Sequence, residues 1–435
     1  MNAIGFKGIL RGSTFVFACR ISGAVAGFAT QVFLARWMGA AELGVYVFAL
    51  SSCILLSTLV GLGYSKAAVR FLGEALEKEL PGYHRGYVST GRQIALLFGS
   101  AVAAGVALFA WLTDVLVDDT HFYAYAFAMA AVPLFASIRL DSAVALANSW
   151  VRLSFIPAQV LRPGLLLLFV AMIWYVGGDL SANIVMGVHF FVILLLALGG
   201  LWIISRRLAP VYGDAEPRFE RRRWTRTAIP LLIIVVMTSY LPEVTVVVIG
   251  LYLPADDVAI FNACFRVAFL IAFGVNAVDA MLLPRVARLY VAGDQDQMQS
   301  LVARASVLKF VGGAVAVLIL LFFGRAILNI FGPEFVVGYQ ALLILAVSQW
   351  LIGFMGSLSN LLNVTGHQDY CLQVFFWALL LLVGLNLLLA PRFGIVGAAV
   401  ATLSVIVFWN LLLYGAVVKR LNVHPTVLAF RRAFS

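Results

Sequence analysis

Long apolar runs, separated by short polar stretches, fill almost the whole chain. A helix that crosses the hydrocarbon core of a bilayer needs about 20 predominantly apolar residues, and most of these runs reach that length. The pattern predicts an all-α polytopic membrane protein. It has about twelve transmembrane helices, near residues 12–35, 42–64, 93–113, 122–147, 155–176, 182–204, 228–251, 257–283, 306–328, 335–363, 370–390 and 394–417.

The most charged stretch runs from Ser205 to Thr227 and cannot span a membrane. We expect residues 205–227 to form a basic cytoplasmic linker between an N-lobe, residues 1–204, and a C-lobe, residues 228–435. The halves match weakly at a nearly constant offset of 213–215 residues, which places Arg70 on Arg285 and Gln159 on Gln373. This repeat predicts two parallel six-helix lobes around a central cavity. Transporters of this build open the cavity to one side of the membrane and then to the other by rocking the two lobes.

The distribution of the basic residues predicts the orientation of the chain in the membrane. Of the 30 Lys and Arg residues, 23 fall in alternate connections that include both termini, and 3 fall in the opposite connections. Loops rich in Lys and Arg stay in the cytoplasm. Both termini are therefore predicted to be cytoplasmic, and the stretch that follows Lys7 and Arg11 is read as a retained first helix.

Composition agrees with this pattern. Hydrophobic residues make up 63% of the chain, charged residues 11%, and the mean hydropathy is +1.01. Because the basic residues lie in short loops, the net charge of +10 sets membrane orientation and does not indicate a nucleic-acid partner. The four cysteines lie singly in apolar runs and are interpreted as packing residues.

Several chemical signatures are missing from the sequence. It contains no G-x-x-x-x-G-K-[ST] nucleotide loop, no H-E-x-x-H and no clustered Cys/His spacing for a metal. The predicted outer loops are too short to fold as a catalytic domain. We therefore expect no cofactor, nucleotide or metal and no enzyme activity, with a polymerase or ligase as the least favoured interpretation.

Arg20, Arg139 and Arg162 lie inside predicted spans of the first half, at similar depths on the cytoplasmic side. Charges in spanning helices are costly and usually face a bundle interior or a watery cavity. Helix 1 also places Gln31 on the same small and polar face as Arg20. Because the planar guanidinium suits phosphate, the three arginines are candidates for binding an anionic head group, and Gln31 is a further candidate for lining the cavity. In the alternative interpretation the arginines are structural, paired with Asp141, capping helix ends or snorkelling.

The second half offers structural or coupling candidates. Glu243 and Arg266 lie at matched depths on adjacent helices, which predicts an ion pair. Asp279, near Asn276, is either a proton or cation site or a partner of Lys309 or Arg285.

Several segments resemble one family over nearly the whole chain. They are Leu34-Ala35-Arg36-Trp37-Met38-Gly39, Glu42-Leu43-Gly44-Val45-Tyr46, Gly61-Leu62-Gly63, Val69-Arg70-Phe71-Leu72, Ala228-Ile229-Pro230-Leu231, Phe331-Gly332-Pro333-Glu334-Phe335, Thr365-Gly366 and Gly397-Ala398-Ala399. The sequence is similar to the polysaccharide flippases, the O-antigen and exopolysaccharide type, of the multidrug/oligosaccharidyl-lipid/polysaccharide exporter (MOP) superfamily.

The resemblance implies a flippase of the bacterial inner membrane that moves undecaprenyl-diphosphate-linked oligosaccharide for lipopolysaccharide or exopolysaccharide biosynthesis. Cavity arginines would hold the diphosphate. Its partners would be the lipid-linked oligosaccharide, membrane lipids and other polysaccharide-assembly proteins. The alternative from the same superfamily is a cation-coupled multidrug exporter, which should have an acidic cation site. The glycan, the coupling ion and the oligomeric state do not follow from the sequence.

Overall fold

The computed structural model describes residues 6–113, 119–356, 358–421 and 423–425. Within these ranges the chain is helical and has no β-strand. It divides into two compact units, Met1–Val236 and Met237–Ser435.

Within the described ranges, nine helices are long and apolar enough to span a membrane, and the broken pair α9 and α10 brings the number to ten. Two of these helices each contain two spans. Helix α1 (Phe6–Val60) bends at Gly39, with φ 77°, and α15 (Gln368–Leu421) bends at Gly394, with φ 57°. Both values lie in the left-handed region, which glycine adopts without steric cost. Counting both halves of each bent helix gives the twelve spans predicted, and the all-α multi-span fold is confirmed.

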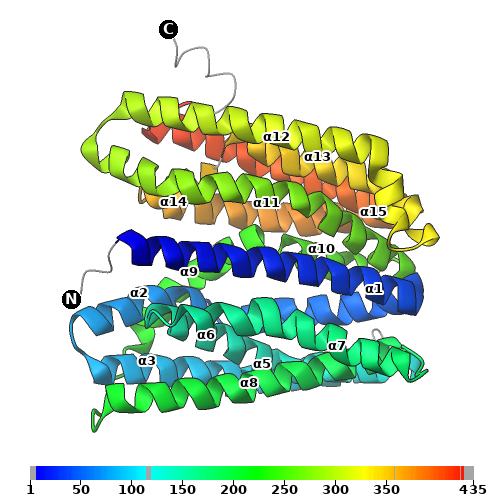
Figure 1. Ribbon diagram of the computed structural model, residues 1–435, viewed down its shortest axis with the longest axis horizontal. Helices are drawn as coiled ribbons and strands as arrows, with labels where there is room; N and C mark the ends of the chain where they lie inside the picture. The colour runs from blue at the N-terminus through cyan, green and yellow to red at the C-terminus, as the bar shows by residue number, and fades with distance from the viewer. Residues whose placement is uncertain (1–5, 114–118, 357, 422, 426–435) are drawn as a thin grey trace. The chain divides into compact units, whose positions relative to one another are not determined.

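Helix α5, the fourth span, lies at the centre of the first unit and packs against α1, α2, α4 and α8 (Figure 1). Small buried residues such as Ala124, Ala128 and Ala131 let its neighbours approach closely. Besides α1, the first unit contains α2 (Tyr64–Glu77), α3 (Pro81–Gln93), η1 (π, Ile94–Phe98), α4 (Gly99–Thr113), η2 (3₁₀, Asp119–His121), α5 (Phe122–Ala147), α6 (Val151–Ile156), η3 (π, Pro157–Leu161), α7 (Arg162–Tyr175), α8 (Ala182–Tyr212) and most of α9 (Arg221–Ser239).

The second unit has a matching centre. Its fourth span is α13, which packs against α11, α12 and α15. The equivalent place of α5 and α13 supports the predicted repeat of six helices. The span expected at 335–363 is interrupted at Gly356. The helices of this unit are α10 (Leu241–Ile249), α11 (Ala255–Ala292), α12 (Gln295–Asn329), η4 (3₁₀, Pro333–Gly338), α13 (Tyr339–Met355), α14 (Leu358–Val364) and α15.

The predicted linker 205–227 is mostly helical, because α8 continues to Tyr212 and α9 begins at Arg221. The intervening residues 213–220 dock on α3, where the Arg218 amide donates to the Gly82 carbonyl at 2.8 Å. A Cβ on Gly86 would lie 2.0 Å from the Arg218 carbonyl oxygen, so this approach requires glycine. Trp224 is fully buried, and its indole donates to the Tyr83 hydroxyl at 2.6 Å. The arginine-rich start of α9 is thus part of the first unit, and the boundary between the units falls at 236/237.

Candidate functional site

Two of the three candidate arginines meet at one aromatic ring. Arg139 comes from α5 and Arg162 from the start of α7, and their guanidinium carbons lie 5.4 Å and 5.1 Å from the centre of the Phe135 ring. Phe135 is 6% exposed, whereas both arginines are half-buried. We call Phe135, Arg139 and Arg162 the Phe135 cluster. A guanidinium within about 6 Å of an aromatic face is attracted by the ring quadrupole, which orients both cations.

Helix α1 holds Arg139 in place. One terminal nitrogen of Arg139 donates to the Thr58 hydroxyl, and the other approaches the Ile54 carbonyl oxygen at 3.5 Å. Both acceptors are neutral. Among residues 122–176 the sequence has one acid, Asp141, and it binds elsewhere.

Arg162 lies at the start of α7, directly after an irregular turn of helix. The π turn η3 precedes it, and Pro163 follows it. Proline cannot donate a backbone hydrogen bond, and π turns occur frequently at functional sites. Helix α1 passes very close to η3, because a Cβ on Gly23 would lie 2.7 Å from the Gln159 carbonyl oxygen.

Two first-half candidates, Gln31 and Arg20, remain. Gln31 is buried in α1, with 5% of its surface exposed. The side chain of Arg20, like that of Asn276 in the second unit, lies outside the described part of the structure.

Asp141 pairs with Arg92 of α3, one of whose nitrogens lies 3.0 Å from the carboxylate. Arg92 also donates to the Ser205 hydroxyl at 2.8 Å. The sequence suggested Asp141 as a structural partner for the intramembrane arginines. Its observed partner is Arg92, which the sequence placed in the connection before the span at 93–113. In the structure Arg92 lies within a continuous helical segment, Pro81–Leu112.

Asp279 has a different setting in the second unit. Lys309 donates to one of its oxygens and Asn360 donates to the other at 3.2 Å. Asp279 is 5% exposed and Lys309 is 3% exposed. Lys309 is one of the two partners that the sequence offered, and it lies in α12. A cation could bind Asp279 only by displacing this lysine.

Glu243 and Arg266 were expected to form an ion pair. The Arg266 side chain donates to the Asn262 side-chain oxygen, one turn earlier in α11, at 3.1 Å. Glu243 lies in the first turn of α10. The pair stays a prediction.

Sequence reasoning missed Phe135, Thr58 and Asn360. An aromatic or hydroxyl residue in an apolar run carries no signal of its own, since most such residues only pack. Among the described residues, no group of three His, Cys, Asp or Glu could hold a metal ion.

Comparisons with known proteins give the family. A family model described as polysaccharide biosynthesis protein matches residues 9–290, and the MatE model matches residues 230–389. The probable low-salt glycan biosynthesis flippase Agl15 of Haloferax volcanii is 24% identical over 403 residues, which are 91% of this chain and 80% of that protein.

Solved structures share the fold at low identity. An inward-facing multidrug resistance MATE family transporter of the MOP superfamily has a TM-score of 0.72 at 12% identity, covering 91% of this chain and 95% of its own. The lipid II flippase MurJ, in an inward closed conformation, has a TM-score of 0.71 at 13% identity. The match covers 93% of this chain and 87% of the MurJ chain. These likenesses confirm the predicted multi-span transporter fold. Because the first family model covers more than half of the chain, the protein belongs to the polysaccharide biosynthesis protein family, and its fold is that of the MATE transporter and of the flippase MurJ.

Proposed function

We propose that this protein is a flippase that carries undecaprenyl-diphosphate-linked oligosaccharide, an O-antigen or exopolysaccharide repeat unit, across the bacterial inner membrane. The family match and the likeness to a glycan biosynthesis flippase support a lipid-linked glycan as the substrate class. In this proposal both termini are cytoplasmic, and the lobes 1–204 and 228–435 alternate access to the substrate.

The meeting of Arg139 and Arg162 at Phe135 carries the proposal. A phosphate that enters a membrane protein loses its hydration, and a desolvated anion is costly unless donors replace the water. Two guanidinium groups from separate helices can supply paired hydrogen bonds to a diphosphate. Their half-buried setting leaves them accessible while the Phe135 ring and the Thr58 hydroxyl orient them.

Arg20 is proposed to complete the set from α1, with Gln31 as a neutral donor farther along the same helix. The lipid tail stays in the bilayer, and the sugar needs only a polar space. This division of labour explains why the sequence shows no tight carbohydrate motif.

A cation-coupled drug exporter is the second candidate, because the MATE transporter and the MatE model both match the chain. Such an exporter needs an acidic cation site. Asp279 is the candidate, and its oxygens accept from Lys309 and Asn360, which favours the flippase.

The test is complementation of surface-polysaccharide export in a strain that lacks this gene. Arg139→Ala with Arg162→Ala should abolish export at normal protein levels. The matched control, Arg285→Ala with Arg288→Ala, removes the same charge from exposed positions of α11 and should export normally. Full export by the well-expressed Arg139, Arg162 double variant would overturn the proposal, and drug resistance conferred without polysaccharide export would favour the exporter.

A further inference from the structure

A strongly basic groove lies at the start of α9, away from the Phe135 cluster. It has a volume of about 590 Å³, and we call it the arginine groove. The residues that define it are Phe219, Glu220, Arg221, Arg222, Arg223 and Arg226.

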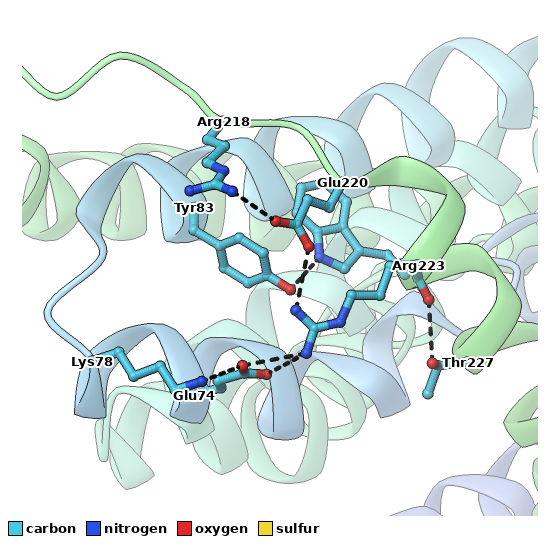
Figure 2. A network of polar contacts seen from close by, with 8 residues as sticks. Glu74, Lys78, Tyr83, Arg218, Glu220, Arg223 and Thr227 are labelled. Atoms are coloured by element: carbon cyan, nitrogen blue, oxygen red, sulfur yellow. Dashed lines mark hydrogen bonds and ion pairs between the residues drawn. The ribbon is translucent and has the colours of Figure 1, made fainter.

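The arginines of this region fall into two groups. Arg218 and Arg223 pair with Glu220, and Arg223 also pairs with Glu74 at 3.0 Å (Figure 2). Arg221 donates to the side chain of Gln93 and lies over the Phe219 ring. These three arginines are satisfied by the protein itself.

Arg222 and Arg226 form the second group. Both are exposed, and neither makes an ion pair or side-chain hydrogen bond with any residue that the structure describes. They are four residues apart in α9, so they lie on the same face of the helix. Two adjacent guanidinium groups without a protein counter-ion form a site for an anion with several oxygen acceptors.

The backbone that carries this pair is held firmly. Trp224 and Ala228 on the opposite face are fully buried against α2 and α3, and the Tyr64 hydroxyl bonds to the Thr225 hydroxyl at 2.9 Å. A rigid support lowers the entropy lost when a ligand binds. The arginine groove is therefore preorganised, unlike a cluster of arginines on a mobile loop.

The surface next to the pair indicates what the anion is attached to. One turn beyond Arg226, Ile229 is 44% exposed, and the helix continues as a membrane span. Phe219, which lines the groove, is 45% exposed, and aromatic residues are enriched at membrane interfaces. A ligand at this level presents a phosphate to the arginines and a hydrocarbon chain to Ile229.

We propose that the arginine groove binds an anionic phospholipid of the leaflet that α9 enters, with the lipid phosphate held by Arg222 and Arg226. The site is separate from the transported substrate. Its occupant stabilises the contact of α9 with α2 and α3, because it neutralises the repulsion between the two exposed arginines.

The experiment measures lipid retention by native mass spectrometry of the purified full chain. The probes are phosphatidylglycerol and phosphatidylcholine with identical acyl chains. The wild type should retain phosphatidylglycerol preferentially. Arg222→Gln with Arg226→Gln should weaken its binding by about tenfold or more, since each basic residue near an anionic lipid surface contributes about 1 kcal/mol.

Two further variants make the result specific. Arg222→Lys with Arg226→Lys keeps the charge without the planar fork and should lose only part of the affinity. Arg285→Gln with Arg288→Gln removes two exposed charges from α11 and should bind as the wild type. Unchanged phosphatidylglycerol binding by the glutamine double variant, an equal loss in the α11 control, or equal retention of phosphatidylcholine by the wild type would each overturn the proposal. Melting temperatures of all variants check that they are folded, and the single Arg226→Gln variant gives the same comparison should the double variant not fold.

Discussion

Arg139 in the first unit and Lys309 in the second are both cations inside predicted spans, yet their surroundings differ. Lys309 is 3% exposed and donates to the carboxylate of Asp279, which also accepts from Asn360. Arg139 is half-buried, and its described hydrogen bonds reach the neutral oxygens of Thr58 and Ile54. The two intramembrane charges therefore differ in setting: Lys309 completes a buried ion pair, whereas Arg139 is half-buried and shares the Phe135 ring with a second arginine.

The largest expected effect comes from breaking the closed pair. Lys309→Ala leaves the buried Asp279 carboxylate without its cation, and loss of one partner of a buried pair costs about 3–5 kcal/mol. The melting temperature in detergent should fall sharply, and expression should fall with it.

Removal of both charges provides the control. Asp279→Asn with Lys309→Met leaves no buried charge and should recover most of the lost stability. A Lys309→Ala variant as stable as the wild type would show that Asp279 does not need its lysine, which would reopen the cation-site interpretation.

A smaller effect should follow from separating α1 from η3. A Cβ at Gly23 would lie 2.7 Å from the Gln159 carbonyl oxygen, so Gly23→Ala should force the backbones apart at a cost of about 1–3 kcal/mol. Because η3 immediately precedes Arg162, polysaccharide export should fall further than protein level does.

Gly27→Ala is the matched control on the same helix, one turn further on, where no atom lies within 4 Å of an added Cβ. It should leave both export and protein level unchanged. Equal behaviour of the two alanine variants would contradict the assignment of Gly23 as the contact that positions Arg162.

The smallest effect concerns the orientation of Arg139. Thr58→Val removes the hydroxyl that accepts from its guanidinium, and a hydrogen bond to a charged group contributes about 1.5–3 kcal/mol at most. We expect a several-fold loss of transport rate with little change in melting temperature. Thr58→Ser keeps the hydroxyl and should restore transport; failure of that rescue would assign the effect to packing.

The sequence was sufficient for the spans. Hydropathy indicates how far along a helix a residue lies, and on that basis the sequence grouped Arg139 with Arg162. It does not record how each helix is rotated about its axis or which helix lies beside it. For that reason the meeting at Phe135 and the pairing of Asp141 with Arg92 were beyond sequence reasoning.

Connections were harder to predict than spans. The span expected at 306–328 begins too late, because α12 begins at Gln295 and the polar residues before 306 continue the same helix. Residues 205–227 read as a linker because they are charged. Trp224, one apolar residue among arginines, instead docks the end of that stretch on α3.

Binding of a polyprenyl diphosphate to the purified protein tests whether the Phe135 cluster holds a diphosphate. Arg139→Ala with Arg162→Ala should weaken binding by about a hundredfold or more, because charge-assisted hydrogen bonds of about 1.5–3 kcal/mol are lost from each arginine. Its melting temperature should stay close to that of the wild type, in contrast to Lys309→Ala. An unchanged affinity for the polyprenyl diphosphate in the folded double variant would show that Arg139 and Arg162 do not bind the diphosphate.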